Sequence, residues 1–251
     1  MKKFLEAFAK ELIYGGHWSS LAAPSIVFVS SVVLRLPLTW DCLLATYFGV
    51  HATRMYNRYK EFEKDLATNP ERSKHIRKYL RYLPILIVLF STVALGLPLL
   101  FGRIWGILIG IFMIFFGFLY SKFFKGKIKV VAFKDFYVAF WWSLLPIFAT
   151  LYYAQPITFA SILFAVFVFL RLFINISFFD IKDVQVDRKE NVITLPVAFG
   201  VKKTISVLWI LSIFSLLPIA LGIALQLLSL IHISVPTRPR LISYAVFCLK
   251  K

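Results

Sequence analysis

The sequence predicts an all-α fold, a polytopic membrane bundle of seven transmembrane helices. Of its 251 residues, 60% are apolar and 16% are charged, and the mean hydropathy is +0.79. A soluble domain has about 45–50% apolar and about 25% charged residues, so the excess of apolar side chains has to face lipid. Seven apolar runs are long enough to cross a bilayer as helices. These observations exclude an ordinary soluble domain, a disordered chain and a disulfide scaffold.

The seven runs are predicted to be helices rather than strands. None alternates with the period of two that marks a β-strand, and a helix satisfies its own backbone hydrogen bonds in lipid. In chain order they cover residues 19–36, 40–59, 82–101, 104–120, 136–153, 157–179 and 204–227. Prolines occur inside several of them, which the membrane setting tolerates. Before the first run, residues 1–18 predict either an amphipathic helix at the membrane interface or an extension of the first span.

Basic residues concentrate on one side of these spans. Twenty-one lie in the N-terminal arm and in the segments after the second, fourth and sixth spans, whereas the opposite side has Arg35 and Arg103. The positive-inside rule therefore places the N-terminus and the Asp-rich loops described below in the cytoplasm, at the cell membrane if the chain is prokaryotic. Because topology accounts for most of the net charge of +17, no nucleic-acid partner is expected.

The last 24 residues differ in character from the rest. Residues 228–251 read LSLIHISVPTRPRLISYAVFCLKK, which resembles translated sequencing-adapter DNA. We therefore expect one transmembrane domain over residues 1–227 and a non-native tail over 228–251. A short natural tail is the alternative.

Two clusters of oxygen-bearing side chains follow the second and sixth spans. Three residues in each are spaced i, i+4, i+8 or i, i+3, i+7, which predicts one helical face for each set. Both spans run in the same direction, so both clusters are expected at the same membrane face. A single cluster would be explained by a solvated, salt-bridged loop, but two matched clusters favour a shared site. The residues are Asn57, Glu61 and Asp65 in the first cluster and Asp180, Asp183 and Asp187 in the second.

Clustered carboxylates repel one another unless a cation lies between them. Mg²⁺ fits this chemistry, because it takes oxygen ligands from one or two carboxylates, waters and substrate phosphates. Cys and His do not cluster nearby, so softer metals are not expected. Two acidic faces at the membrane surface could hold two Mg²⁺ ions bridged by a diphosphate, and neighbouring basic side chains could bind the remaining phosphate oxygens.

At these motifs the chain resembles the UbiA superfamily of intramembrane prenyltransferases. Residues 169–200, FLRLFINISFFDIKDVQVDRKENVITLPVAFG, are similar to the second Asp-rich motif of that family and its Thr-Leu-Pro sequence. The stretch NRYKEFEKD is similar to the first motif, with Arg58 and Glu61 where Asp is usual. The stretch YSKFFKGK resembles the family's tyrosine–lysine loop after the fourth helix.

The resemblance implies nine helices around a central cavity, of which seven are found here. It implies Mg²⁺-dependent transfer of a prenyl chain from a polyprenyl diphosphate to a lipophilic acceptor, preferably aromatic, among the membrane lipids. Quinone and lipid biosynthesis both use such products. The alternative is a cation-binding transporter of lipids or ions without catalysis.

The resemblance also implies roles for individual residues. Asp65, Asp183 and Asp187 would be catalytic, and the six residues of both clusters would hold the metal ions and the diphosphate. Asp180 could instead orient a partner. Tyr120 could anchor the helix at the interface, and Arg171 could join two helices. The diphosphate-binding candidates are Arg54, Lys122 and Lys125, and the cavity candidates are Tyr120, Arg171 and Asn175.

Overall fold

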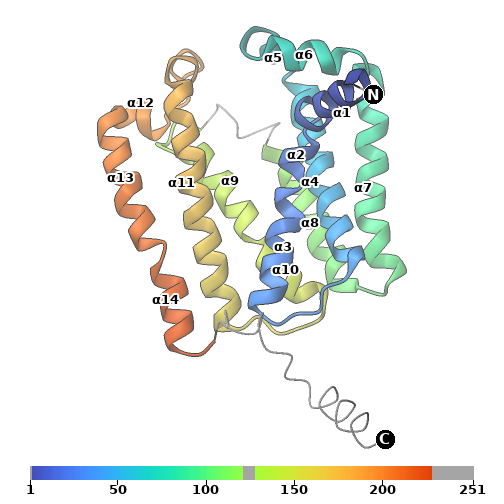
Figure 1. The fold of residues 1–251 in the computed structure, drawn as a ribbon, viewed down its shortest axis with the longest axis vertical. Helices are drawn as coiled ribbons and strands as arrows, with labels where there is room; N and C mark the ends of the chain where they lie inside the picture. Colours follow the sequence, from blue (N-terminus) through green and yellow to red (C-terminus); the bar gives the residue numbers. More distant parts are fainter. Residues whose placement is uncertain (1, 121–127, 228–251) are drawn as a thin grey trace, which may run out of the picture.

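The computed structural model describes residues 2–120 and 128–227, and every regular element in these ranges is a helix (Figure 1). The all-α membrane bundle predicted from composition is confirmed. The elements are α1 (Lys2–Tyr14), α2 (His17–Ser20), α3 (Ala22–Val33), α4 (Trp40–Lys60), α5 (Phe62–Thr68), α6 (Pro70–Arg77), the 3₁₀ helix η1 (Leu80–Tyr82), α7 (Leu83–Leu100), α8 (Ile104–Leu119), α9 (Phe133–Ser143), α10 (Leu145–Tyr152), α11 (Phe159–Lys189), α12 (Leu195–Phe199), α13 (Val201–Phe214) and α14 (Leu217–Ala224). The expected tail, residues 228–251, lies outside the described residues.

Each of the seven predicted spans coincides with helical structure. In the described ranges, three helical stretches are long and apolar enough to cross a membrane: Leu80–Leu100, Phe159–Lys189 and Val201–Ala224. Two shorter apolar stretches are His17–Val33 and Ile104–Leu119. The number of complete crossings therefore stays a prediction, while the membrane character of the bundle follows from these helices.

Three predicted spans are not continuous helices. The run 19–36 divides into α2 and α3 at Leu21. The run 136–153 divides into α9 and α10 at Leu144, and the run 204–227 divides into α13 and α14 at Ser215–Leu216. Pro146 and Pro218 lie at the second position of the following helix. Proline lacks an N–H and its ring clashes with the carbonyl four residues earlier, so each proline starts a new helix instead of sitting inside one.

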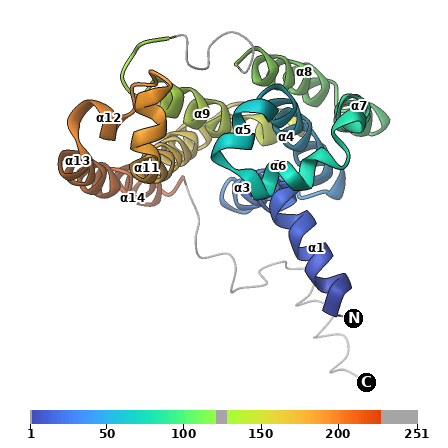
Figure 2. The same cartoon turned by 90° about the horizontal axis from the view of Figure 1, so that it is seen from above.

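The helices form two groups that meet at α9 and α10. In Figure 2, α4, α7 and α8 lie on one side, α11, α13 and α14 on the other, and α9 between them. One end of the bundle carries the C-terminal ends of α4 and α11 and is overlaid by α1, α5 and α6 (Figure 1). We call it the Asp-rich end, because both predicted clusters belong to it.

The N-terminal helices are fixed to the Asp-rich end by polar contacts. The Arg58 guanidinium donates to the carbonyl oxygen of Tyr14 at 2.5 Å, and His75 Nε2 lies 2.7 Å from Glu11 Oε2. His51 is fully buried with its Nδ1 2.9 Å from Ser20 Oγ. Arg58 therefore has a structural contact in this fold. The apolar side chains of α1 remain exposed, as expected for an interfacial amphipathic helix: Phe4, Leu5, Phe8 and Ile13.

Candidate active site

A buried polar cluster joins the first turn of α9 to the last turns of α11. The Lys134 ammonium donates to Asp180 Oδ1 at 2.8 Å and lies 3.6 Å from Asp187 Oδ2. Asp135 is fully buried and accepts a hydrogen bond of 2.8 Å from the Ser177 hydroxyl. Three carboxylates and one ammonium thus share a small volume at the Asp-rich end.

The helical register of α11 selects which aspartates enter this cluster. Asp180 and Asp187 are seven residues apart, so both fall on the face that α9 covers, and both are buried. Asp183 lies between them in sequence but is exposed. The second predicted cluster is therefore split, with two carboxylates facing α9 and one facing outward.

Electrostatics favours the charged form of Lys134. This residue precedes the apolar part of α9. Burial opposes its charge, but the surrounding carboxylates, foremost Asp180, outweigh burial and raise the pKa of Lys134. Burial and the adjacent Asp180 also raise the pKa of Asp135.

The first predicted cluster lies on a bent segment. Helix α4 ends at Lys60, and Glu61 separates it from α5 with φ −105° and ψ 11°. Asn57 remains on α4, and its buried Oδ1 has no hydrogen-bond partner among the described residues. Asp65, on α5, forms an ion pair of 2.7 Å with Arg72 of α6. The spacing i, i+4, i+8 therefore does not correspond to one continuous helix.

Tyr120 lies between the two clusters. It follows α8, its ring stacks on Tyr137 with centroids 4.5 Å apart, and it is buried. Its hydroxyl is within electrostatic reach of Glu61 from the first cluster and of Asp135 and Asp180 from the second. The fold thus brings parts of both motifs around one phenol. Lys122 and Lys125, two residues expected to bind diphosphate, lie outside the described residues.

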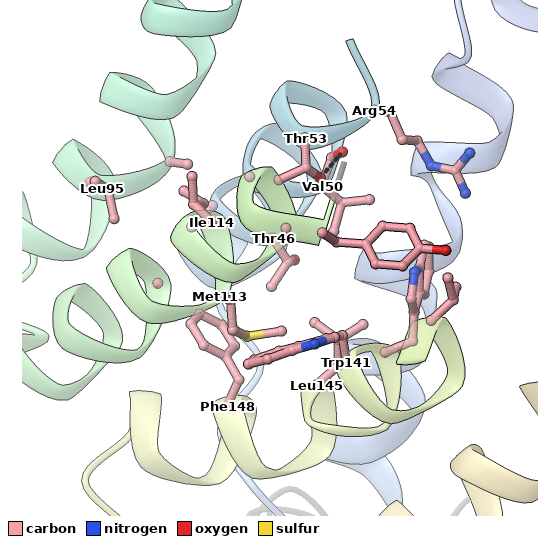
Figure 3. A pocket seen from close by; sticks show the side chains of 18 of the residues that line it. Thr46, Val50, Thr53, Arg54, Leu95, Met113, Ile114, Trp141, Leu145 and Phe148 are labelled. Atoms are coloured by element: carbon pink, nitrogen blue, oxygen red, sulfur yellow. Dashed lines mark hydrogen bonds between the residues drawn. The ribbon is translucent and has the colours of Figure 1, made fainter. Parts of the chain in front are cut away.

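A cavity of about 270 Å³ leads away from this polar region between α4, α7, α8, α9 and α10 (Figure 3). Arg54, Asn57 and Tyr120 supply polar groups at one end, and Arg54 packs over the Trp142 ring at 5.5 Å. The rest of the lining is mostly apolar and aromatic. In Figure 3, Arg54 lies at one end of the cavity and Phe148 at the other. The cavity therefore divides into a polar end and a mostly apolar remainder, a division that an amphiphile also has.

Two predicted cavity residues lie elsewhere. Arg171 and Asn175 line a separate groove between α11 and α13, together with Trp209 and Ser212. On the 3.6-residue period of α11 this face is opposite to that of Asp180. Of the three cavity candidates, Tyr120 lines the cavity beside the carboxylates, whereas Arg171 and Asn175 do not.

The sequence analysis missed Lys134, Asp135 and Ser177 as site residues. Lys134 was counted only among the basic residues that indicate the membrane topology, and an isolated Lys-Asp pair matches no motif. One signal could have found them, since two adjacent ionisable residues directly precede a long apolar run and therefore lie at a membrane boundary.

The donor set is suited to a hard cation. Asn57 Oδ1, Asp180 Oδ2 and Asp187 Oδ2 are buried oxygens without a hydrogen-bond partner among the described residues. Among the residues that the structure describes, no three His, Cys, Asp or Glu side chains are grouped so that they could hold a metal ion by themselves. Mg²⁺ does not require such a cage, because it usually takes one or two carboxylates together with waters and substrate phosphates.

Fold and cavity together define a polytopic helical membrane protein whose cavity has a polar end beside buried carboxylates and a mostly apolar lining elsewhere. The chain belongs to the UbiA prenyltransferase family, whose family model matches residues 18–251. It is therefore a membrane-embedded prenyltransferase, and its substrates are a prenyl diphosphate and a lipophilic acceptor. The transporter alternative is set aside by this membership.

The fold is also similar to a solved structure from work on digeranylgeranylglyceryl phosphate synthase in membranes. The TM-score is 0.65 at 18% identity, over 92% of this chain and 81% of that chain. At this identity the likeness concerns the fold. A comparison with curated proteins finds no match.

Proposed function

We propose that the chain transfers a polyprenyl group to a lipophilic acceptor, preferably aromatic, in a Mg²⁺-dependent reaction inside the membrane. The observation that carries this proposal is the division of the cavity lining, which has Arg54, Asn57 and Tyr120 at its polar end and mostly apolar and aromatic side chains elsewhere. A polyprenyl diphosphate has the same division into a charged head and a long apolar chain.

The diphosphate would lie between the two acidic motifs. Asn57 and Glu61 would serve from the α4–α5 bend, and Asp180, Asp183 and Asp187 from α11. Bound Mg²⁺ would neutralise the negative charge that the leaving diphosphate gains as its C–O bond breaks. Asp65 joins this set only if its ion pair with Arg72 opens.

The chain's own residues supply binding, orientation and exclusion of water. The Arg54 guanidinium supplies a charged donor for phosphate oxygens at the cavity end, and Lys122 and Lys125 would add two more. As the C–O bond breaks, its electron pair leaves with the diphosphate, and the acceptor attacks the allylic carbon and then loses a proton. The rings of Tyr137, Trp141 and Trp142 line the cavity, where they can stabilise an allylic cation and exclude water.

The membrane orientation follows from the charge distribution. We place the N-terminus and the Asp-rich end in the cytoplasm, because the basic residues concentrate there. Cysteine labelling from either side of sealed vesicles tests this. An exposed site such as Glu71→Cys should react from the cytoplasmic side only.

A direct test uses the full chain in lipid nanodiscs with Mg²⁺, a radiolabelled C10–C30 series of prenyl diphosphates and a set of aromatic and lipid acceptors. We expect transfer of label to acceptor and release of diphosphate. Chelation of divalent ions should abolish both, and added Mg²⁺ should restore them. Asp187→Asn should lose transfer, whereas the matched surface variant Glu71→Gln should keep it. Transfer that persists at full rate in chelator would overturn the metal assignment.

A further inference from the structure

The apolar end of the cavity meets packed side chains. Beyond Phe148 lies a hydrophobic cluster of fully or nearly fully buried side chains, among them Cys42, Ala149 and Tyr152. The Tyr152 hydroxyl donates to the buried Asp41 at 2.6 Å, which fixes its ring behind Gly106. A chain that enters from the polar end therefore meets a packed and hydrogen-bonded floor.

The depth of the cavity follows from helix geometry. Asn57 and Ala45 both line it and are 12 residues apart on α4, so they lie about 18 Å apart along the helix axis at 1.5 Å per residue. Tyr120 and Gly106 mark a similar length of about 21 Å beside α8. An extended protein backbone advances about 3.6 Å for every three bonds. An isoprene unit contributes four bonds to its chain, so it spans about 5 Å when extended. The cavity is thus about four isoprene units deep.

The middle of the cavity is kept open by a glycine. Gly49 lies eight residues from Asn57 on α4, about 12 Å from the polar end. A Cβ built on Gly49 would meet its nearest atoms, on Ala94 and Ile114, at 3.7–3.9 Å, which is ordinary van der Waals contact. The Cβ of a larger side chain at this position therefore fits without a clash. The rest of that side chain would project into the cavity about two isoprene units below the diphosphate.

We propose that this cavity acts as a ruler for the prenyl donor: the floor formed by Phe148 and Tyr152 limits the chain to about four isoprene units, and Gly49 admits units beyond the second. The proposal rests on the proposed function, since it takes the cavity as the site of the prenyl chain. It names the substrate class as C20 and shorter prenyl diphosphates.

The test is competition binding to the full-length protein in nanodiscs of one lipid composition. Labelled geranyl diphosphate (C10) is the probe, because it fits above Gly49 in every variant. Unlabelled C10, C15, C20, C25 and C30 prenyl diphosphates are the competitors. The variants are Gly49→Leu, Phe148→Ala and the matched control Gly96→Leu, whose glycine has no atom within 4 Å of an added Cβ and does not line the cavity.

In the wild type we expect C20 to compete at least as well as C10, and C30 to be weaker than C20 by about tenfold or more, a ratio equivalent to about 1.4 kcal/mol. Gly49→Leu should weaken C20 relative to C10 by a similar factor, and Gly96→Leu should match the wild type. Phe148→Ala should strengthen C25 relative to C20, so the inference does not depend on one variant folding.

Two results would overturn the ruler while leaving the proposed function intact. One is equal competition by C20 and C30 in the wild type. The other is the same length dependence in Gly49→Leu as in Gly96→Leu. A wild-type protein that binds none of the prenyl diphosphates would instead contradict the proposed function, and the ruler with it.

Discussion

Replacing Lys134 by methionine should destabilise the protein, because the Lys134 ammonium lies within ion-pairing distance of both Asp180 and Asp187. Methionine keeps most of the length and apolar volume of the lysine stem and removes the charge. The variant leaves three buried carboxylates together, since Asp135 lies beside them.

The size of the effect follows from the geometry. At 2.8 Å and an effective dielectric constant of about 20, the attraction between Lys134 and Asp180 is about 6 kcal/mol before desolvation. Breaking one partner of a buried pair costs about 3–5 kcal/mol. The Lys134 side chain is 23% exposed, which favours the lower end of that range. About 3 kcal/mol corresponds to a fall in Tm of roughly 6–12 °C for a chain of this size.

The assay is thermal unfolding of the purified protein in detergent, with divalent ions chelated. The pKa of Lys134 is raised above its ordinary value, so the pair contributes fully at neutral pH and its contribution is lost only as the pH rises through that raised pKa. Lys182→Met is the matched control, because Lys182 is exposed and its ammonium lies 5.3 Å from the centroid of the Phe179 ring. It should change the free energy of unfolding by less than about 0.5 kcal/mol.

Equal melting temperatures for Lys134→Met and Lys182→Met would refute this reasoning. The double variant Lys134→Met/Asp180→Asn gives a second check. If the two side chains interact as described, the double variant should be more stable than the sum of the single effects predicts, by about 1 kcal/mol or more.

Three further predictions concern the two ends of the cavity. Asp187→Asn should lower the rate of prenyl transfer by on the order of 100-fold, as measured by the initial consumption of prenyl diphosphate; turnover within about threefold of the wild type would contradict its role. Tyr152→Phe should lower the free energy of unfolding by about 1–3 kcal/mol, as measured by thermal unfolding, because Asp41 loses a buried hydrogen bond. An unchanged melting temperature would show that this hydrogen bond does not stabilise the floor of the cavity. Gly106→Val should lower the free energy of unfolding by about 1–3 kcal/mol, because its Cβ would lie 2.6 Å from Tyr152 Cδ2. Gly96→Val should lower it by about 1 kcal/mol or less, because a Cβ on Gly96 would have no atom within 4 Å.

The fold was predictable because lipid imposes one requirement on every spanning segment. An apolar run of sufficient length has to be helical to satisfy its backbone, so composition located the helices. The breaks at Leu144 and at Ser215–Leu216 were not predicted. A membrane proline can either remain inside a helix or start a new one, and tertiary packing decides between the two.

The candidate site was predictable where one helix carries it. The seven-residue interval between Asp180 and Asp187 placed both on one face of α11, and both are buried there. Asp65 was expected beside Asn57, but the bend at Glu61 and the ion pair with Arg72 depend on how α5 and α6 pack. Local spacing does not contain that information.

The sequence patterns did not predict that residues of α9 belong to the site. Lys134 and Asp135 acquire their partners from α11, more than 40 residues later in the chain. The cavity is likewise a product of packing, although the glycines of α8 could have signalled close helix approach. Gly117, for example, packs so closely on Thr53 that a Cβ would lie 2.8 Å from it.

The central claim is that the prenyl chain occupies the cavity between α4, α8, α9 and α10 while its diphosphate lies at the Asp-rich end. Photocrosslinking with a prenyl diphosphate that carries a diazirine at its far end tests this most directly, with the labelled peptide identified by mass spectrometry. We predict Mg²⁺-dependent labelling of α10 around Leu145 and Phe148. Labelling of the groove around Arg171 and Trp209 instead would contradict the account.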